Sequence, residues 1–397
     1  MGGVYKRKEG RAIRGLVNRI MPQLYSKGVS DARCLLDIDF ADLLEREAIS
    51  LQSSEAKAVL RKKVILVTGA AGSIGSELCK QLLEYEPEML IALDTNETGL
   101  FDLVNSVRLH VSSGLLFPFI GDIKDFPRIS RLFAQARPQV VFHAAAYKHV
   151  PLLEQFPDQA VQTNAIATYR LCQVAQKYGV ERFLYISSDK AAAPVSVLGA
   201  SKRFGEVIVQ SFAQSMSYST QFCAVRFGNV IGSRGSVVPI FAGQIECGGP
   251  VTVTDPEATR YFMTIAEACG LVIMTSAIAE QGGLYMLDMG KPIRILDLAK
   301  KMIRLHGLRE GQDIPIVYTG LRPGERLHET LVAANEEPLP TVHSKILRIV
   351  HTYELPALST IAQWMQILEN SLHTESLEQL REQLFELMQA HELVTTK

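Results

Sequence analysis

The chain has 397 residues, of which 47% are hydrophobic and 21% are charged, a composition typical of a soluble globular protein with a sizeable core. Its 41 Lys and Arg side chains nearly balance its 42 Asp and Glu side chains, so no overall field favours nucleic acid or an anionic membrane as a partner. No apolar stretch approaches the ~20 residues that span a bilayer, and the basic start at residues 5–8 is not followed by a signal-peptide core. We therefore expect a soluble, cytoplasmic protein that holds any anionic ligand by a local arrangement.

The six cysteines are scattered, without a C-x-x-C pair or a histidine at metal-ligand spacing. This pattern predicts no metal site. It predicts thiols that pack in the core of a protein from a reducing compartment, at Cys34, Cys79, Cys172, Cys223, Cys247 and Cys269.

A glycine-rich turn follows the first predicted strand. Residues 1–62 mix short helical patterns, notably at 39–47, with charge, and predict an arm or linker. Residues 64–68 then predict a buried strand, followed by glycines spaced G-x-x-G-x-x-G and by a helix over 76–83. This spacing differs from G-x-G-x-x-G, but a strand before it and a helix after it favour a dinucleotide site, because the backbone can approach a pyrophosphate there. The predicted cofactor contacts are Gly69, Gly72, Ser73, Ile74 and Gly75.

The next strand, predicted over 89–93, ends at Asp94. This residue lies about 20 positions beyond the glycines, where a carboxylate can accept hydrogen bonds from both ribose hydroxyls. The alternative, that Asp94 caps the helix that follows, is compatible with this role but accounts for less. Thr95 and Asn96 come next, with no Arg to hold a 2′-phosphate, so we expect NAD and not NADP.

Strands predicted at 116–120 and 140–144, with helices between them, continue the alternation and predict a Rossmann-type doubly wound parallel α/β sheet over 63–226. Asp122 and Ile123 at one strand end are expected to meet the adenine. Small residues that would give the cofactor backbone clearance follow the other strand, at Ala144, Ala145 and Ala146. Lys148 and His149 come directly afterwards and are within reach of a substrate, although a lone His is more often a structural residue.

The central stretch begins with a strand predicted over 182–187. Its carboxyl end presents Ser188, Asp189 and Lys190 where ligands bind in open α/β sheets. Pro194 interrupts the helical pattern, which resumes over 198–210 and carries Lys202 and Arg203. A solvated Asp-Lys pair is the ordinary alternative, but the position at a strand end favours a functional crevice.

After a strand predicted at 221–226 the alternation is lost, which predicts a smaller C-terminal lobe over 227–351, with some segments returning to the core. A helix at 295–305 and a strand at 314–318 belong to it. Its loop arginines suit a diphosphate clamp because the guanidinium fork pairs two phosphate oxygens, although a surface salt bridge is the alternative for each. Residues 352–397 carry apolar side chains at helical spacing from 358 to 393 and predict a helical tail that packs on the body or on a partner chain.

These motifs make the chain resemble the bacterial UDP-N-acetylglucosamine 4,6-dehydratases of polysaccharide biosynthesis, members of the extended short-chain dehydrogenase/reductase superfamily. The resemblance runs from about Asp37 to His351. Larger relatives carry amino-terminal transmembrane helices and a further domain, so we expect either a compact natural form or a soluble part of such a protein. Five motifs in order carry the resemblance, namely Thr68–Gly75, His143–Pro151, Ser187–Lys190, Arg260–Met263 and Arg322–Glu325.

One position departs from the superfamily. A tyrosine usually stands four residues before the active-site lysine, and here that position is Leu198. Relatives that also lack the tyrosine resemble the subgroup that retains configuration at C5 of the sugar. The identity of the first proton acceptor therefore stays open.

The resemblance implies NAD as cofactor, a UDP-sugar as substrate and a homo-oligomeric assembly. NAD⁺ would take hydride from C4 and so make the C5 proton acidic, and the hydride would return to C6. Lys190, if neutral, would remove the C5 proton, and Asp189, if its pKa is raised, would protonate the leaving C6 hydroxyl. Ser188 would orient the C4 hydroxyl, and Lys202 would bond the nicotinamide ribose. The expected substrate-binding residues are Lys148, Asn229, Arg260, Arg322 and Glu325.

Two other functions stay open. One is a nucleotide-sugar 4-epimerase, which shares the fold but normally needs the tyrosine and has no adjacent Asp-Lys pair. The other is a catalytically silent NAD-binding regulator that has lost its tyrosine. The presence of Asp189 and Lys190 speaks against both.

Overall fold

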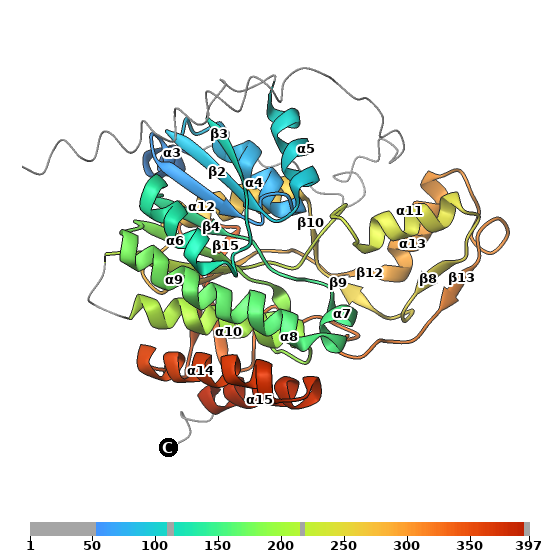
Figure 1. Cartoon of the computed structure of the whole chain (residues 1–397). Helices are drawn as coiled ribbons and strands as arrows, with labels where there is room; N and C mark the ends of the chain where they lie inside the picture. Colours follow the sequence, from blue (N-terminus) through green and yellow to red (C-terminus); the bar gives the residue numbers. More distant parts are fainter. Residues whose placement is uncertain (1–52, 109–114, 215–218, 393–397) are drawn as a thin grey trace, which may run out of the picture.

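A nine-stranded sheet forms the centre of the protein, as the computed structural model shows over its described residues 53–108, 115–214 and 219–392 (Figure 1). The strand order is β14-β15-β11-β6-β5-β4-β1-β2-β3. Seven strands run parallel: β1 (Val64–Thr68), β2 (Met89–Asp94), β3 (Leu116–Ile120), β4 (Val140–His143), β5 (Arg182–Ile186), β6 (Gln221–Arg226) and β11 (Leu284–Leu287). The predicted Rossmann-type α/β fold is confirmed. An edge formed by β15 (Ile346–His351) and β14 (Glu336–Pro340), both in antiparallel pairings, was not predicted.

Helices cover both faces of this sheet, because strand side chains alternate between two hydrophobic cores. In β1, for example, Ile65 and Val67 enter one core and Leu66 enters the other. The first core is covered by α3 (Ser54–Leu60), α4 (Ser73–Leu83), α5 (Glu97–Val107) and α12 (Ile265–Ile278). The second is covered by α6 (Phe126–Ala136), α7 (Val150–Gln155), the continuous run α8 (Pro157–Ala160), η1 (Val161–Ile166, π-helical) and α9 (Ala167–Tyr178), and α10 (Val197–Ala213).

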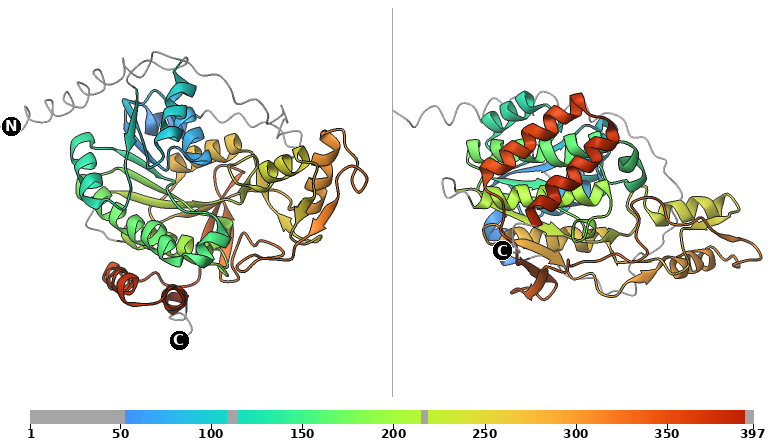
Figure 2. Two further views of the ribbon diagram at one scale, coloured as in Figure 1. Left: turned by 45° about the vertical axis from the view of Figure 1, so that its right-hand side comes forward. Right: turned by 90° about the horizontal axis from the view of Figure 1, so that it is seen from below.

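A smaller lobe with its own hydrophobic core lies beside the sheet (Figure 2). It contains α11 (Val237–Glu246), β8 (Val251–Val253), β9 (Thr259–Arg260), β12 (Ile293–Arg294), α13 (Ile295–Leu305) and β13 (Ile316–Tyr318). A short parallel pair is formed by β7 (Asn229–Val230) and β10 (Phe262–Met263). In the sequence, β7 precedes α11 and β10 follows β9. Helix α12 and strands β11, β14 and β15 also lie within the expected span of 227–351 and join the layers of the main sheet, so they are segments of the kind expected to return to the core.

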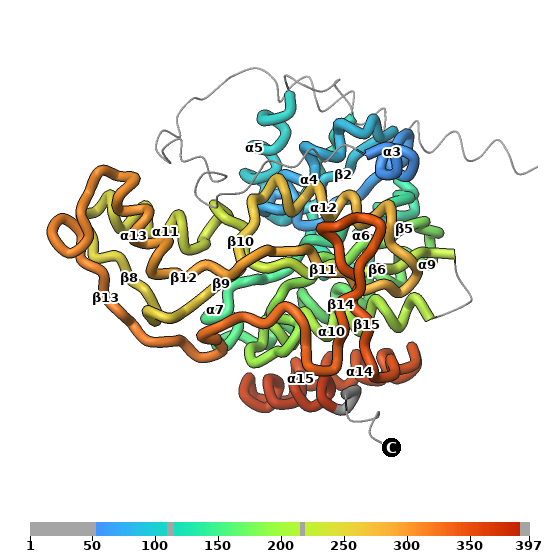
Figure 3. The backbone as a smooth tube through the Cα atoms, turned by 180° about the vertical axis from the view of Figure 1, so that it is seen from behind, coloured from blue at the N-terminus to red at the C-terminus, as the bar shows by residue number. Residues whose placement is uncertain are grey.

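The predicted helical tail is a hairpin of α14 (Leu358–Thr374) and α15 (Leu377–Glu392), and Figure 3 shows the chain passing from β15 into it. Its apolar residues Leu368 and Leu384 pack in the same core as Phe204 of α10. Because sheet and hairpin cover α10 from both sides, every residue of 197–212 is buried. No helix in the described part of the chain is both long and apolar enough to cross a membrane.

Two expectations about the periphery need correction. The end of the predicted arm is part of the main fold, because Ala56 and Leu60 of α3 are buried in a core. Cys247 is exposed and is not a core thiol, whereas Cys79, Cys172, Cys223 and Cys269 are buried. The helical pattern at 39–47 and Cys34 lie outside the described residues.

Candidate active site

The glycine-rich turn places the first turn of α4 at the carboxyl end of β1. The helix begins at Ser73, after Gly72, and not at residue 76 as expected. Gly69 has φ +69°, and a Cβ there would lie 2.7 Å from the Ala145 backbone nitrogen. A Cβ on Gly75 would collide with the carbonyl oxygen of Gly69. Glycine is therefore required for the packing of turn, helix and β4 end, and this packing leaves the helix N–H groups at the strand end, where the pyrophosphate site is predicted.

Asp94 holds the same turn from the end of β2. Its Oδ2 accepts the Ala71 N–H at 2.9 Å, and its Oδ1 accepts the Asn96 N–H at 2.9 Å. Asn96, not Asp94, caps α5, through a 3.0 Å bond from the Gly99 N–H to Asn96 Oδ1. The capping alternative for Asp94 is therefore wrong, and each of its oxygens keeps acceptor capacity for a ribose hydroxyl.

The segment predicted to meet the adenine continues from the neighbouring strand β3. The Gly121 N–H donates to the Asp94 carbonyl at 2.9 Å, which joins the two strand ends. Asp122 Oδ1 accepts the Lys124 N–H at 2.8 Å. The Ile123 side chain is buried in the second core. Contacts of Asp122 and Ile123 with a cofactor stay a prediction.

His143 fixes the end of β4, where Ala144, Ala145 and Ala146 begin. Its Nε2 lies 2.9 Å from Thr168 Oγ1, and its Nδ1 lies 2.7 Å from Thr68 Oγ1. Because the Thr168 hydroxyl donates to the Asn164 carbonyl, it can only accept from His143, so Nε2 carries the proton and Nδ1 accepts from Thr68. Burial, with Lys202 adding to it, lowers the pKa of His143 to about 3. His143 is thus a neutral structural residue that orders the cofactor side of the site.

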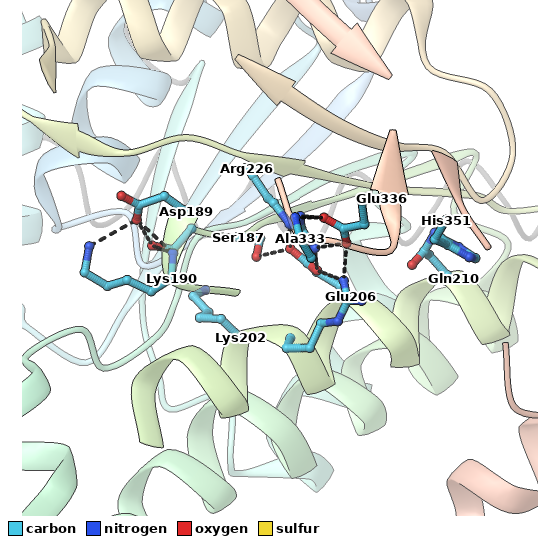
Figure 4. Close-up of polar contacts among 12 residues, drawn as sticks. Ser187, Asp189, Lys190, Lys202, Glu206, Gln210, Arg226, Ala333, Glu336 and His351 are labelled. Atoms are coloured by element: carbon cyan, nitrogen blue, oxygen red, sulfur yellow. Dashed lines mark hydrogen bonds and ion pairs between the residues drawn. The ribbon is translucent and has the colours of Figure 1, made fainter. Parts of the chain in front are cut away.

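Asp189 is the most enclosed acid at the end of β5, with 1% of its surface exposed (Figure 4). The backbone holds it in place through a 3.1 Å bond from its N–H to the Phe227 carbonyl. Its Oδ1 accepts from Ser188 Oγ at 2.8 Å, from the Lys190 N–H at 2.9 Å and from Lys190 Nζ at 3.1 Å. Its Oδ2 is buried and has no hydrogen-bond partner among the residues that the structure describes. One oxygen is therefore engaged, and the other keeps its acceptor capacity unused within the described residues.

Lys190 lies between two carboxylates. Its Nζ is 3.1 Å from Asp189 Oδ1 and 3.3 Å from Oε1 of Glu329, a residue whose side chain is 6% exposed. Burial alone would lower the pKa of Lys190, but the two carboxylates outweigh it, so the pKa stands above its usual value. The neutral amine expected for Lys190 is therefore not the form that the ligand-free protein favours. Sequence reasoning missed Glu329, although it stands four residues after Glu325 of a motif used for the resemblance.

Arg260 reaches the same cluster from the lobe, with its Nε 3.6 Å from Glu329 Oε1. Its Nη1 donates to the carbonyls of Thr259 and Leu327 at 2.7 and 3.0 Å, and its Nη2 donates to that of Arg326 at 2.8 Å. Most of its donors thus fasten the segment that carries Glu329. A diphosphate contact from Arg260 stays a prediction and would compete with these bonds.

The Arg322-Pro-Gly-Glu325 loop closes on itself. Arg322 is 55% exposed, with its Nε 3.8 Å from Glu325 Oε1, and its N–H donates to Glu325 Oε2 at 3.2 Å. Gly324 has φ +77° and packs against Glu154 and Ser196, so the loop lies at the start of α10. The exposed guanidinium of Arg322 is available to an anion.

Lys202 lies one turn after Leu198 on α10. It is 6% exposed, donates to the Ile186 carbonyl at 2.7 Å and lies 4.6 Å from the ring centroid of Tyr185. Burial lowers its pKa to about 7, although Glu206 acts in the opposite direction. Leu198 is 4% exposed and belongs to the second hydrophobic core. Helix α10 therefore presents the Lys202 amine at the end of β5. Leu198 supplies neither an acid nor a hydroxyl group there.

A buried ion cluster joins this region to the edge strand β14 (Figure 4). Glu206 accepts from Ser187 Oγ at 2.5 Å and from Arg226 Nε at 2.6 Å. Glu336 accepts from Arg226 Nη1 at 2.6 Å and from Arg203 Nη1 at 2.8 Å. Burial raises the pKa of Glu336, but the two arginines outweigh it and hold the pKa at about 2. The cluster balances two positive and two negative charges, as burial requires, and it fixes the strand end at Ser187.

A loop from the start of the lobe crosses the glycine-rich turn. The Arg234 N–H donates to Ser73 Oγ at 3.1 Å, and Arg234 Nη1 donates to the Ala71 carbonyl at 3.2 Å. Lys148 Nζ donates to the Arg234 carbonyl at 3.0 Å. Burial, with Arg234 adding to it, lowers the pKa of Lys148. Asn229 lies at the base of this loop, where its N–H donates to the Tyr261 carbonyl at 3.0 Å. Sequence reasoning missed Arg234, which brings a cation to the predicted pyrophosphate site.

The comparisons with known proteins agree with this geometry. The family described as "Polysaccharide biosynthesis protein" matches residues 65–351. The capsular polysaccharide biosynthesis protein CapD of Staphylococcus aureus is 44% identical over 322 residues, which cover 81% of this chain and 53% of that protein. The probable polysaccharide biosynthesis protein EpsC of Bacillus subtilis (strain 168) is 44% identical over 335 residues, or 84% of this chain and 56% of that protein. The chain thus spans about half the length of these relatives.

Two solved structures have a similar overall fold. Pen from Bacillus thuringiensis is 31% identical, with a TM-score of 0.66 over 75% of this chain and 89% of that one. The UDP-glucose 4-epimerase of Thermus thermophilus, in complex with NAD, is 25% identical, with a TM-score of 0.58 over 68% of this chain and 90% of that one. Because the family match extends from β1 to β15, the chain belongs to the polysaccharide biosynthesis protein family.

Proposed function

We propose that the protein binds NAD and catalyses the 4,6-dehydration of UDP-N-acetylglucosamine to the UDP-4-keto-6-deoxy sugar, for bacterial surface-glycan synthesis. The observation that carries the proposal is the Asp189-Lys190 ion pair at the end of β5, in which Asp189 is buried, Lys190 is partly exposed and one Asp189 oxygen is unengaged within the described residues. Elimination of water from a sugar needs an acid and a base side by side, and this pair supplies both. A cytoplasmic location and a homo-oligomeric state stay predictions.

The residues around the glycine-rich turn fit NAD. Gly69 and Gly75 leave no room for a Cβ, α4 presents its first N–H groups, and Asp94 has acceptor capacity for ribose hydroxyls. Arg234 adds a positive charge near the expected pyrophosphate. When bound, NAD⁺ would accept hydride from C4 of the sugar and return it to C6. Lys202, next to the Ile186 carbonyl, would hold the nicotinamide ribose.

The protein's own residues would move the protons. Asp189 is the base within this site that can take the C4 hydroxyl proton, since Leu198 has no polar atom, and it then becomes the acid for the C6 hydroxyl. Ser188 donates to Asp189 Oδ1 and would orient the C4 hydroxyl beside it. Lys190 would remove the C5 proton. Lys148, Asn229, Arg322 and Glu325 would contact the substrate, with Arg260 holding the lobe segment next to them.

Product analysis tests the proposal. The protein is incubated with NAD⁺ and UDP-N-acetylglucosamine in deuterated water, and the sugar is followed by proton NMR. We expect a C6 methyl signal and one deuterium at C5. The 4-epimer without a methyl group would show an epimerase, and unchanged substrate would favour the silent regulator. Either result would overturn the dehydratase assignment.

A further inference from the structure

We propose that Glu329 accepts the proton that Lys190 must release before its amine can act on C5 of the sugar. The inference rests on the dehydration proposed above. Glu329 would not touch the substrate, so it is a positioning residue that acts through Lys190.

Glu329 brings a second carboxylate to Lys190 from the lobe side of the chain. The Lys190 ammonium contacts Asp189 Oδ1 at 3.1 Å and Glu329 Oε1 at 3.3 Å, and both carboxylates are nearly inaccessible to solvent. Arg260 Nε, at 3.6 Å from Glu329 Oε1, is the further charged group that faces this cluster within the described residues. The four groups are neutral together, with two cations and two anions. A proton can therefore move among them without changing the net charge of the site.

The chemistry requires such an acceptor. A lysine ammonium has no lone pair, so Lys190 cannot take a carbon-bound proton until it has lost one of its own. Asp189 is not free to accept it, because Asp189 takes the C4 hydroxyl proton in a site where Leu198 cannot. Within the described part of the chain, Glu329 is the remaining carboxylate in contact with Lys190 Nζ.

The protons then balance over one turnover. The C4 hydroxyl proton passes to Asp189, and a Lys190 proton passes to Glu329. The neutral Lys190 amine takes the C5 proton, while Asp189 gives its proton to the C6 hydroxyl, which leaves as water. After hydride has returned to C6, Lys190 gives a proton back to C5 and recovers one from Glu329. The lost water contains the original C4 hydroxyl proton, and every side chain ends as it began.

The lobe holds Glu329 for this role. Arg260 donates to the carbonyls of Arg326 and Leu327, and the Thr259 N–H donates to the Leu327 carbonyl at 3.0 Å. Thr259 Oγ1 also lies 2.9 Å from His328 Nδ1. This bonding fixes the backbone just before Glu329.

The test compares wild-type protein with Glu329→Gln and Glu329→Asp, and uses Glu337→Gln on the exposed face of β14 as a charge-matched control. The absorbance of NADH in a single turnover reports hydride removal, and NMR in deuterated water reports C5 exchange. We expect E329Q to keep hydride removal but to lose about 10²-fold or more in C5 exchange. E329D should recover part of it, and E337Q should match wild type.

A C5 exchange rate in E329Q that is unchanged or raised would overturn the inference. If Glu329 only stabilised the ammonium, its removal would make neutral Lys190 easier to form, and C5 exchange in E329Q would equal or exceed that of wild type. Loss of hydride removal in E329Q would also overturn it, by showing a role in binding. In the ligand-free protein, the ¹³Cε shift of Lys190 should titrate at lower pH in E329Q, and an unchanged titration would show that the contact is absent. A wild type that makes no keto-deoxy sugar would instead reject the proposed function.

Discussion

Lys202→Met should change how the stability of the protein depends on pH. Folding buries Lys202 and lowers its pKa from the ordinary 10.5 to about 7. An unfolded chain therefore holds this proton up to about pH 10.5, whereas the folded chain releases it above about pH 7. The contribution of Lys202 to the free energy of unfolding is therefore fully present above the pKa of the unfolded chain. It is lost as the pH falls through the pKa of the folded chain, because protons bind the unfolded state more tightly.

The size of the effect follows from the two pKa values. Between pH 9 and pH 7 the linkage relation gives a loss of about 2 kcal/mol from Lys202. Methionine fills a similar volume and does not titrate. The stability of K202M relative to wild type should therefore rise by about 2 kcal/mol when the pH is lowered from 9 to 7.

Urea unfolding at both pH values measures this difference. Trp364, the single tryptophan of the chain, packs against Phe204 of α10 with ring centroids 5.7 Å apart, so its fluorescence reports the helix that carries Lys202. Lys177→Met removes an exposed lysine from α9 and serves as the control. Equal stability differences at pH 9 and pH 7 would refute the burial argument for Lys202.

Three further outcomes test the site. Cofactor released from the protein by heat should have the mass of NAD, because Asp94 would repel a 2′-phosphate, and NADP as the main species would contradict this role of Asp94. Lys190→Met should abolish C5 exchange and dehydration but preserve NAD binding measured by calorimetry, and normal turnover would reject Lys190 as the base. Asp189→Asn should give no NADH absorbance when substrate is added, whereas absorbance that rises and then stalls would leave Asp189 as the acid alone.

The central strands could be predicted from sequence because each is a short apolar run between turn residues. The predicted bounds of β3, β6 and α13 coincide with the observed ones. The start of α4 was placed too late because Ser73-Ile-Gly75 reads as loop, whereas the first helical turn tolerates a glycine that packs on Gly69. Strand β14 escaped prediction because Pro338 and Pro340 interrupt any alternating pattern. An edge strand tolerates proline, since one side of its backbone pairs with no neighbour.

The parts of the site that sequence did not reveal are those formed by distant residues. Asp189 and Lys190 were visible as a pair at a strand end. Glu329 stands 139 positions after Lys190 in the numbering, and no local pattern links them. Glu336 was likewise not singled out by sequence, and the fold brings it to Arg226. Tertiary proximity, and not composition or spacing, brings these acids to their partners.

Leu198 leaves the proposed acid and base roles to groups at the end of β5. Its side chain packs in the hydrophobic core beside the first turn of α10, so a polar group there would need a buried partner. The helix keeps Lys202, whose amine is directed to the Ile186 carbonyl and whose lowered pKa limits its positive charge near neutral pH. In the proposed mechanism, proton transfer then depends on groups from the strand end and from the lobe. Asp189, Lys190 and Glu329 meet there through successive contacts of 3.1 and 3.3 Å. Because Glu329 reaches Lys190 only through the segment that Arg260 fastens, the position of the lobe decides whether Lys190 has its second carboxylate.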